Sequence, residues 1–162
     1  KKYIYKKILQ KQYKKTSGKA HPQKAHQKNS KINSMNILFA IQEIPGKGRG
    51  IVSLQDIEAD CIIEVAPVLV MTKEERLHLD QTKLHDYIFE WKANGKDQCC
   101  VALGHVSMYN HSYQSNCEYF MDYEQELMFI KTVSAIKAGE ELLINYNGDW
   151  NNETPLWFEA IQ

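Results

Sequence analysis

The chain lacks the long apolar runs, the paired cysteines and the leader sequence that assign many proteins to a class at once. No apolar stretch in its 162 residues approaches the about 18 that a membrane helix needs, and no signal-peptide pattern is visible. The four cysteines (Cys61, Cys99, Cys100 and Cys117) include no CxxC pair, which is unlike a zinc knuckle or a disulfide framework. We interpret them as reduced, mostly buried thiols of an intracellular protein without structural zinc.

Acidic residues are absent from the first quarter of the chain. Residues 1–42 hold eleven lysines and no Asp or Glu, whereas residues 43–162 hold all twenty acids and only nine basic residues. The formal net charge of zero therefore combines a cationic arm with a domain near −11, nine positive charges against twenty negative. An acidic surface attracts a basic, lysine-bearing polypeptide before specific contacts form, although the charge is equally consistent with a role in solubility.

Residues 1–34 are predicted to be a basic, mostly flexible N-terminal arm. They are rich in Lys, Gln and His and show little periodicity, and Ser17-Gly18 and Pro22 interrupt any longer helix. Met35 directly precedes the first strand pattern and is a candidate translation start, which would place the arm upstream of the native protein. If the arm is native, weak non-specific contact with nucleic acid is expected.

The domain that follows, residues 35–162, has the pattern of a mainly β protein with many short strands and a few small helices. Alternating and β-branched residues predict strands over residues 37–42, 51–54, 61–71, 87–91, 98–103, 117–122 and 127–133. Pro67 inside the third of these predicts a break, a bulge or a sheet edge.

Turn and capping residues place the connections between these elements. Asn94-Gly95 is the strongest hairpin signal in the chain, and Glu124-Gln125 is the centre of a second hairpin. The spacing of Thr72 and Glu75 is that of a capping box, which predicts a helix through about Leu79. Thr154-Pro155 predicts a C-terminal helix over residues 155–161.

Three short motifs carry chemical information, although each alone has an ordinary structural explanation. The run GKGRG from Gly46 to Gly50 can be a tight turn between strands, since it matches neither the dinucleotide fingerprint nor a phosphate loop. Asn110-His111-Ser112 can be a turn followed by a core histidine. The strand of residues 139–146, which ends in Tyr146, is common β structure.

Together and in this order, the three motifs resemble the signature of SET-domain protein lysine methyltransferases. Asn116-Cys117 matches the continuation of the second motif. Ser115, where the family usually has proline, and Val106, where a small residue is common, depart from the pattern. The resemblance spans residues 44–158, with a variable insert at about 71–98 and an aromatic closing segment at 147–162.

The resemblance implies a β-clip type SET fold of several short sheets, with a knot-like crossing near the C-terminus. It also implies that S-adenosylmethionine is the cofactor and S-adenosylhomocysteine the product. Backbone groups near Lys47, Gly48 and Arg49 would hold the methionine portion and the ribose. Asn110 and His111 would hold the amino group and the adenine.

Two tyrosines and an aromatic C-terminus complete the implied site. Tyr146 would lie where the substrate nitrogen, the methyl group and the sulfonium meet, so it is both a catalytic and a cofactor-binding candidate. Tyr119 would line the lysine channel as a second catalytic candidate. No cysteine follows Cys117, so the usual post-SET cluster is absent and Trp157 would cover the adenine, unless these aromatics merely anchor the last helix.

The implied function is transfer of a methyl group to the side-chain amine of a lysine in a basic protein or peptide. The alternative is a catalytically silent SET module that binds a peptide or another protein, and a nucleic-acid binder would depend on residues 1–34 alone. The expected location is intracellular: the cytoplasm for a bacterial protein, with the nucleus also open to a eukaryotic one.

Overall fold

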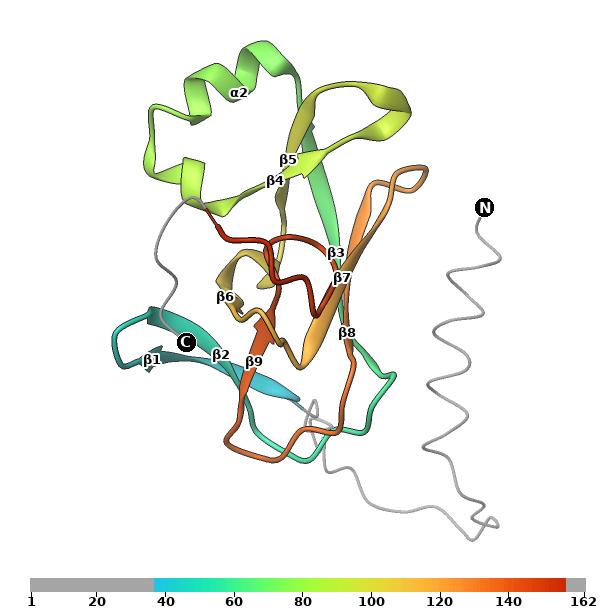
Figure 1. Ribbon diagram of the computed structural model, residues 1–162. Coiled ribbons are helices and arrows are strands. Elements are labelled where there is room, and N and C mark those ends of the chain that lie inside the picture. The colour runs from blue at the N-terminus through green and yellow to red at the C-terminus, as the bar shows by residue number, and fades with distance from the viewer. Residues whose placement is uncertain (1–36, 157–162) are drawn as a thin grey trace, which may run out of the picture. The chain divides into compact units, whose positions relative to one another are not determined.

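The computed structural model describes residues 37–156, which belong to the second of two units, Lys1–Met35 and Asn36–Gln162. The described region is mainly β and contains two sheets (Figure 1). The predicted N-terminal arm lies outside the described residues. So does Trp157.

The first sheet has four strands in the order β1-β2-β9-β6. Its strands are β1 (Phe39–Ile44), β2 (Gly48–Ser53), β9 (Glu141–Ile144) and β6 (Asn110–His111). The first three are antiparallel neighbours, whereas β6 pairs with β9 in parallel. A parallel pair cannot be joined by a tight hairpin, so this contact depends on the whole fold.

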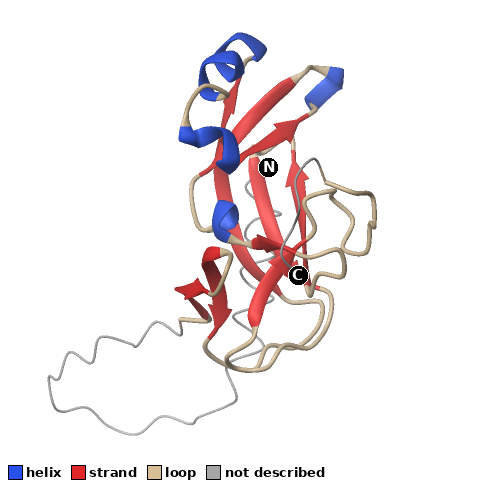
Figure 2. Ribbon diagram, turned by 60° about the vertical axis from the view of Figure 1, so that its left-hand side comes forward, coloured by secondary structure: helices blue, strands red, loops and turns tan. Residues whose placement is uncertain are grey.

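The second sheet has five strands in the order β4-β5-β3-β8-β7 and lies beside the first in both ribbon views (Figures 1 and 2). Its strands are β4 (Ile88–Trp91), β5 (Gln98–Ala102), β3 (Ile62–Met71), β8 (Leu127–Thr132) and β7 (Cys117–Asp122). Both predicted hairpins are confirmed, since β4 pairs with β5 and β7 with β8. Asn94 and Gly95 have the positive φ angles that favour these residue types in a turn.

Helices are few and short among the described residues. The helix α2 (Lys73–Leu79) begins after Thr72 with the predicted capping box, because Glu75 N–H donates to Thr72 Oγ1 over 3.2 Å and Thr72 N–H donates to Glu75 Oε2 over 2.8 Å. The 3₁₀ turns are η1 (Lys83–Tyr87), η2 (Ala93–Gly95) and η3 (Val106–Met108). Among residues 37–156, no helix is long and apolar enough to cross a bilayer.

The core fills the space between the strands with aliphatic, aromatic and sulfur-containing side chains. Its fully buried members include Ile51, Trp91, Val106, Met128, Ile130, Leu142 and Ile144. Each large apolar side chain buried in this way contributes about 1.5–3 kcal/mol to folding. The burial predicted for the cysteines is confirmed for Cys99, Cys100 and Cys117, while Cys61 is partly exposed and all four are free thiols.

Three predictions about element boundaries need correction. The glycine motif is not a separate loop, because β2 begins at Gly48 and only residues 45–47 form the turn. The strand β3 continues through Pro67, and its irregular register lies instead between Ile62 and Glu64. Pro67 is the last residue of β3 opposite β8, where it faces Leu127, and pairing of β3 with β5 starts at Val68. It therefore lies at the end of both ladders, as predicted for a sheet edge, where its missing N–H is tolerated.

The predicted C-terminal helix is also not observed where it can be examined. Pro155 and Leu156 are not helical, and residues 157–161 lie outside the described residues. In the segment before Pro155, side-chain amides donate hydrogen bonds to backbone carbonyl groups. Asn145 Nδ2 donates to the carbonyl of Asn152 over 2.7 Å, and Asn147 Nδ2 donates to that of Thr154 over 2.7 Å.

This C-terminal segment crosses the loop that follows β6, which is the crossing that the sequence implied. The Ser115 N–H donates to the carbonyl of Trp150 over 3.0 Å, and the Ser115 hydroxyl lies 3.1 Å from the same oxygen. The Leu156 N–H donates to the Tyr113 hydroxyl over 3.1 Å. Proline at position 115 could donate neither bond to Trp150, so the departure from the family pattern anchors the crossing here.

Candidate active site

The pairing of β6 with β9 brings together two motifs that are distant in the sequence. Asn110 lies opposite Leu143 and His111 opposite Ile144, so the Asn-His pair lies beside the strand that leads to Tyr146. The Tyr146 N–H donates to His111 Nδ1 over 3.1 Å, and the two rings lie 5.2 Å apart. The tertiary structure therefore joins the second and third sequence motifs directly.

The glycine motif forms the third side of this arrangement. Pro45 and Gly46 occupy the central positions of a turn closed by a 3.0 Å hydrogen bond from Lys47 N–H to the carbonyl of Ile44, and Gly46 has φ +79°. These are the residue types that a type II turn favours at those positions. The turn directs β2 back along β1 and so carries Gly50 to the edge of β9.

Gly50 is required because polar side chains occupy the space beside it. A Cβ atom at this position would lie 2.6 Å from Asn110 Nδ2 and 2.7 Å from Glu141 Oε1. Both distances are well inside ordinary van der Waals contact. The first and second motifs therefore touch only because residue 50 has no side chain.

Glu141 joins the residues predicted to bind the cofactor. Its carboxylate accepts a 2.7 Å hydrogen bond from Asn110 Nδ2 and lies 3.5 Å from Lys47 Nζ, and both side chains of the ion pair are less than one fifth exposed. Asn110 Nδ2 also lies 3.4 Å from the carbonyl of Arg49. These donations orient the amide, so that its oxygen stays available as an acceptor.

Asn116 holds β9 in place beside these groups. Its Nδ2 donates to the carbonyl of Glu141 over 2.8 Å, and its Oδ1 accepts from the N–H of Leu143 over 2.8 Å. A single side chain thus satisfies two backbone groups that would otherwise need a neighbouring strand. This is the structural reason for Asn116 in the sequence motif.

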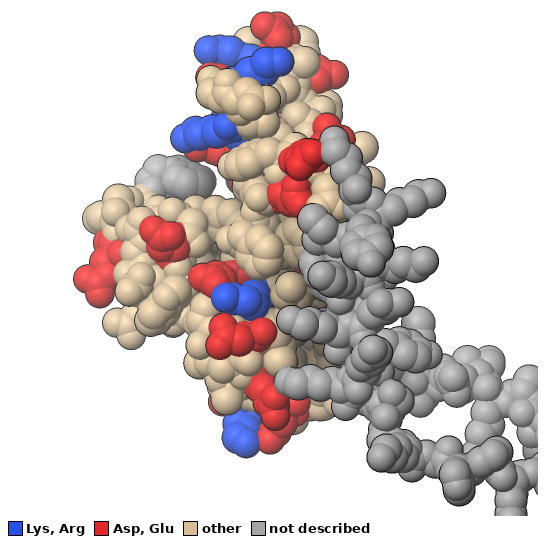
Figure 3. Space-filling model, turned by 90° about the vertical axis from the view of Figure 1, so that its right-hand side faces the viewer, with Lys and Arg blue, Asp and Glu red and all other residues tan. Residues whose placement is uncertain are grey.

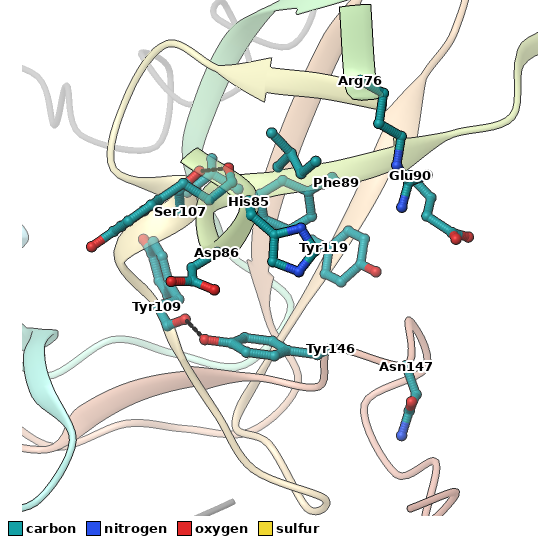
Figure 4. A pocket seen from close by; sticks show the side chains of 13 residues that line it. Arg76, His85, Asp86, Phe89, Glu90, Ser107, Tyr109, Tyr119, Tyr146 and Asn147 are labelled. Atoms are coloured by element: carbon teal, nitrogen blue, oxygen red, sulfur yellow. Dashed lines mark hydrogen bonds between the residues drawn. The ribbon is translucent and has the colours of Figure 1, made fainter. Parts of the chain in front are cut away.

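A cavity of about 960 Å³ lies on the other side of Tyr146, between this residue and the insert. Figure 4 shows Tyr119, Tyr146 and the backbone of Tyr109 around it, with the side chains of the insert opposite. The lining residues are Arg76, His85, Asp86, Tyr87, Ile88, Phe89, Glu90, Val106, Ser107, Tyr109, Tyr119, Tyr146 and Asn147. The tyrosines give this cavity several hydroxyl groups.

The hydroxyls of the two predicted catalytic tyrosines stay protonated at neutral pH. Burial, followed by the nearby Glu141 and Tyr87, raises the pKa of Tyr146 to about 12. Burial also raises the pKa of Tyr119 to about 12, and its ring packs edge-on against Phe89 at 5.4 Å. Neutral hydroxyls can orient an amine by hydrogen bonding without adding a formal charge.

His111 is a buried imidazole that links the predicted cofactor-binding residue Asn110, its neighbour in β6, with Tyr146. Burial, and then the positive charge of Lys47, lowers its pKa. Because Nδ1 accepts from Tyr146, we assign the proton to Nε2, which is buried and has no hydrogen-bond partner among residues 37–156. Such a buried donor without a partner is rare in folded proteins.

The structure places most of the predicted site residues in two adjoining groups. Lys47, Arg49 and Asn110 meet around Glu141, Gly48 begins β2 beside them, and Tyr119 and Tyr146 line the cavity. No group of three or more potential metal ligands occurs among the described residues.

Sequence reasoning missed three residues of this site. Glu141 was visible only as part of a strand pattern, and Tyr109 only as the neighbour of Asn110. Tyr87 lies in the variable insert, where no motif singled it out. For each of them the missing information was the identity of its spatial neighbours, which only the fold supplies.

Comparison with known proteins covers most of this arrangement. A family model described as the SET domain matches residues 48–147. A histone-lysine N-methyltransferase of Schizosaccharomyces pombe, H3 lysine-37 specific, is 38% identical over 120 residues, which are 74% of this chain and 76% of that protein. The histone-lysine N-methyltransferase SETD7 of Halocynthia roretzi is 25% identical over 153 residues, and the match covers 76% of this chain but only 36% of SETD7.

A solved structure gives the same result for the fold. The crystal structure of a Plasmodium falciparum protein assigned as a histone methyltransferase matches with a TM-score of 0.53 and 28% identity. The match covers 69% of this chain and 95% of that one. The residues matched by the family model run from the start of β2 to the residue after Tyr146, so they include every residue of the two groups except Lys47.

Proposed function

Because the chain belongs to the SET-domain family and is a protein-lysine N-methyltransferase, we propose that it methylates a lysine of a histone with S-adenosylmethionine as the methyl donor. The observation that carries the proposal is the junction at Tyr146. On one side of this residue lie Asn110 and His111, and on the other lies a tyrosine-lined cavity. A catalytically silent module would not need this junction, and the named relatives are methyltransferases.

The residues around Glu141 fit the cofactor. The amide oxygen of Asn110 accepts no hydrogen bond from the described residues, so it can accept from the amino group of the cofactor. Lys47 and the half-exposed turn that carries it can meet the carboxylate. The close approach of Asn110 and Glu141 to Gly50 holds the Asn110 amide at this place. Trp157 remains a candidate for covering the adenine.

Methyl transfer requires the substrate lysine to be neutral. When bound, S-adenosylmethionine supplies a methyl group on a cationic sulfonium. A free lysine has a pKa of about 10.4, so formation of the neutral amine at pH 7.4 costs on the order of 4 kcal/mol. Tyr119, Phe89 and Tyr146 surround the cavity with rings, and the resulting desolvation disfavours the ammonium form.

Tyr146 then orients the amine. Its hydroxyl donates to the carbonyl of Tyr109 over 3.0 Å, and a phenolic oxygen that donates in this way can also accept an N–H of the substrate. Tyr119 lies across the same cavity and limits the room around the nitrogen. We therefore assign positioning of the reacting nitrogen to Tyr146 and control of methyl number to Tyr119.

The charge of the domain supports a basic substrate. Residues 37–156 hold nineteen acidic and nine basic residues. On the face drawn in Figure 3, acidic side chains are spread over its length with fewer basic ones between them. Histone tails are lysine-rich, and such a surface raises the rate at which they meet the enzyme. A histone substrate in turn makes the nucleus the proposed place of action.

The test is incubation of the full chain with isotopically labelled S-adenosylmethionine and separate histones, followed by mass spectrometry of the products. An unrelated basic protein of similar charge is the substrate control. We expect the label on a histone lysine. The Tyr146→Phe variant keeps the ring, and its turnover should fall at least about tenfold, or 1.4 kcal/mol of barrier. Label on no histone, from enzyme that binds S-adenosylhomocysteine, would overturn the proposed substrate.

A further inference from the structure

Tyr109 is held at both ends, and one end contacts the catalytic tyrosine. Its hydroxyl donates to Glu64 Oε2 over 3.1 Å, while its backbone carbonyl accepts from the Tyr146 hydroxyl over 3.0 Å (Figure 4 shows the second bond). The side chain is only 1% exposed. The position of this carbonyl therefore depends on how the buried tyrosine ring is anchored.

Glu64 is a rigid anchor for this ring. Its side chain, in β3, is 8% exposed, and its Oε1 also accepts from the N–H of His105 over 2.6 Å. A Cβ atom on Gly104 would lie 2.5 Å from the same Oε1, so the backbone closes tightly around the carboxylate. Two hydrogen bonds to a buried carboxylate are strong and directional.

The ring and the following segment are fixed from other directions as well. Phe39 packs edge-on against both His105 and Tyr109, with ring centroids 5.4 and 6.3 Å apart. The Ser107 hydroxyl donates to the carbonyl of Tyr87 over 2.8 Å, which ties the same segment to the insert. Burial and the neighbouring Glu64 raise the pKa of Tyr109, so its hydroxyl remains a donor.

From this geometry we propose that Glu64 and Tyr109 are positioning residues for Tyr146. Glu64 holds the Tyr109 hydroxyl, Tyr109 presents its carbonyl, and this carbonyl fixes the direction of the Tyr146 O–H bond. The inference rests on the proposed catalytic role of Tyr146. It adds a chain of two hydrogen bonds that runs from Glu64 in β3 through Tyr109 to Tyr146.

The test is a double-mutant cycle on the full chain. Tyr109→Phe removes only the hydroxyl that Glu64 holds, and Glu64→Gln keeps the shape of the anchor but replaces an acceptor with a donor. Each is combined with Tyr146→Phe, and single-turnover methylation is followed by mass spectrometry. Thr132→Val is the matched control, since it removes a buried hydroxyl that donates to the carbonyl of Glu58 and does not line the cavity.

We expect Tyr109→Phe to lower kcat about tenfold, because small misplacement of a reacting group is costly, with the KM for cofactor nearly unchanged. In the Tyr146→Phe background the same change should lower kcat less than about twofold, since the hydroxyl it positions is already gone. Thr132→Val should have the same effect in both backgrounds. Equal losses from Tyr109→Phe in both backgrounds, or no loss in either, would refute the inference.

A spectroscopic measurement tests the link between Tyr109 and Tyr146 if methylation by the Tyr146→Phe variants is too slow to measure or if Glu64→Gln does not fold. The ¹³Cζ resonance of labelled Tyr146 reports the hydrogen bonding of its hydroxyl. It should shift in Tyr109→Phe and stay in place in Thr132→Val, and an unchanged resonance in Tyr109→Phe would refute the link. This readout needs no turnover, so failure of the proposed substrate or activity is distinguishable from failure of the positioning role.

Discussion

Replacing Gly50 with alanine should weaken cofactor binding through the local geometry at Asn110, beyond its cost to folding. The new methyl group would lie 2.6 Å from Asn110 Nδ2, 2.7 Å from Glu141 Oε1 and 2.7 Å from Ile44 Cγ1. Carbon atoms in good contact are about 3.5–4.0 Å apart, so each neighbour has to move by nearly 1 Å. Two of these three atoms belong to the proposed cofactor site.

The structure sets the size of the effect. An added methyl group in a packed position costs about 1–3 kcal/mol in unfolding free energy. The polar side chains can yield only by breaking the 2.7 Å bond between Asn110 and Glu141, and a hydrogen bond to a charged group is worth about 1.5–3 kcal/mol. Because that bond orients the amide that we propose to meet the cofactor, we expect affinity for S-adenosylhomocysteine to fall at least about tenfold.

The assay combines calorimetric titration of the purified chain with S-adenosylhomocysteine and a thermal melt of the same samples. Gly139→Ala is the matched control. Gly139 has φ +90°, and nothing lies within 4 Å of the position its Cβ would take. Alanine at position 139 should lower the unfolding free energy by about 1–2 kcal/mol through backbone strain alone. We expect this control to melt earlier but to bind S-adenosylhomocysteine like the wild type.

Unchanged affinity in folded Gly50→Ala protein would refute the reasoning, because the pair of side chains beside residue 50 would then not form the cofactor site. Equal losses of affinity in both variants would also refute it. In that case the affinity would follow general stability and not the local geometry at Asn110.

Three further predictions concern other parts of the molecule. Tyr119→Phe should alter the ratio of mono- to higher-methylated product in mass spectra more than it alters total turnover, and a proportional loss of all products would contradict this. Folding lowers the pKa of His111 from 6.5, so the unfolded chain binds more protons and the unfolding free energy should decrease as the pH falls below 6.5. Melts across pH 5–8 should show this decrease in the wild type and a smaller one in His111→Asn. A chain that starts at Met35 should melt within a few degrees of the full chain, since residues 1–34 contain few apolar residues, and a large decrease would mean that the arm packs on the domain.

The sequence by itself determined the elements whose signals are local. The capping box from Thr72 to Glu75 and the turn at Asn94-Gly95 are contained within a few neighbouring residues, so they could be located before the fold was known. The order of the glycine, Asn-His and Tyr146 motifs was sufficient to indicate the family. Local signals left the role of Pro67 open, because whether a missing N–H matters depends on where the partner strands begin and end.

Only the tertiary structure decided which side chains act together. Glu141 meets Asn110 and Lys47 because β9 lies between β2 and β6, and no periodicity in the sequence encodes that order. Tyr109 contacts Tyr146 through a backbone carbonyl, a group that every residue has and that a sequence therefore cannot single out. Strand order and backbone direction are set by the packing of the whole chain, so the assembly of the site became visible only in the fold.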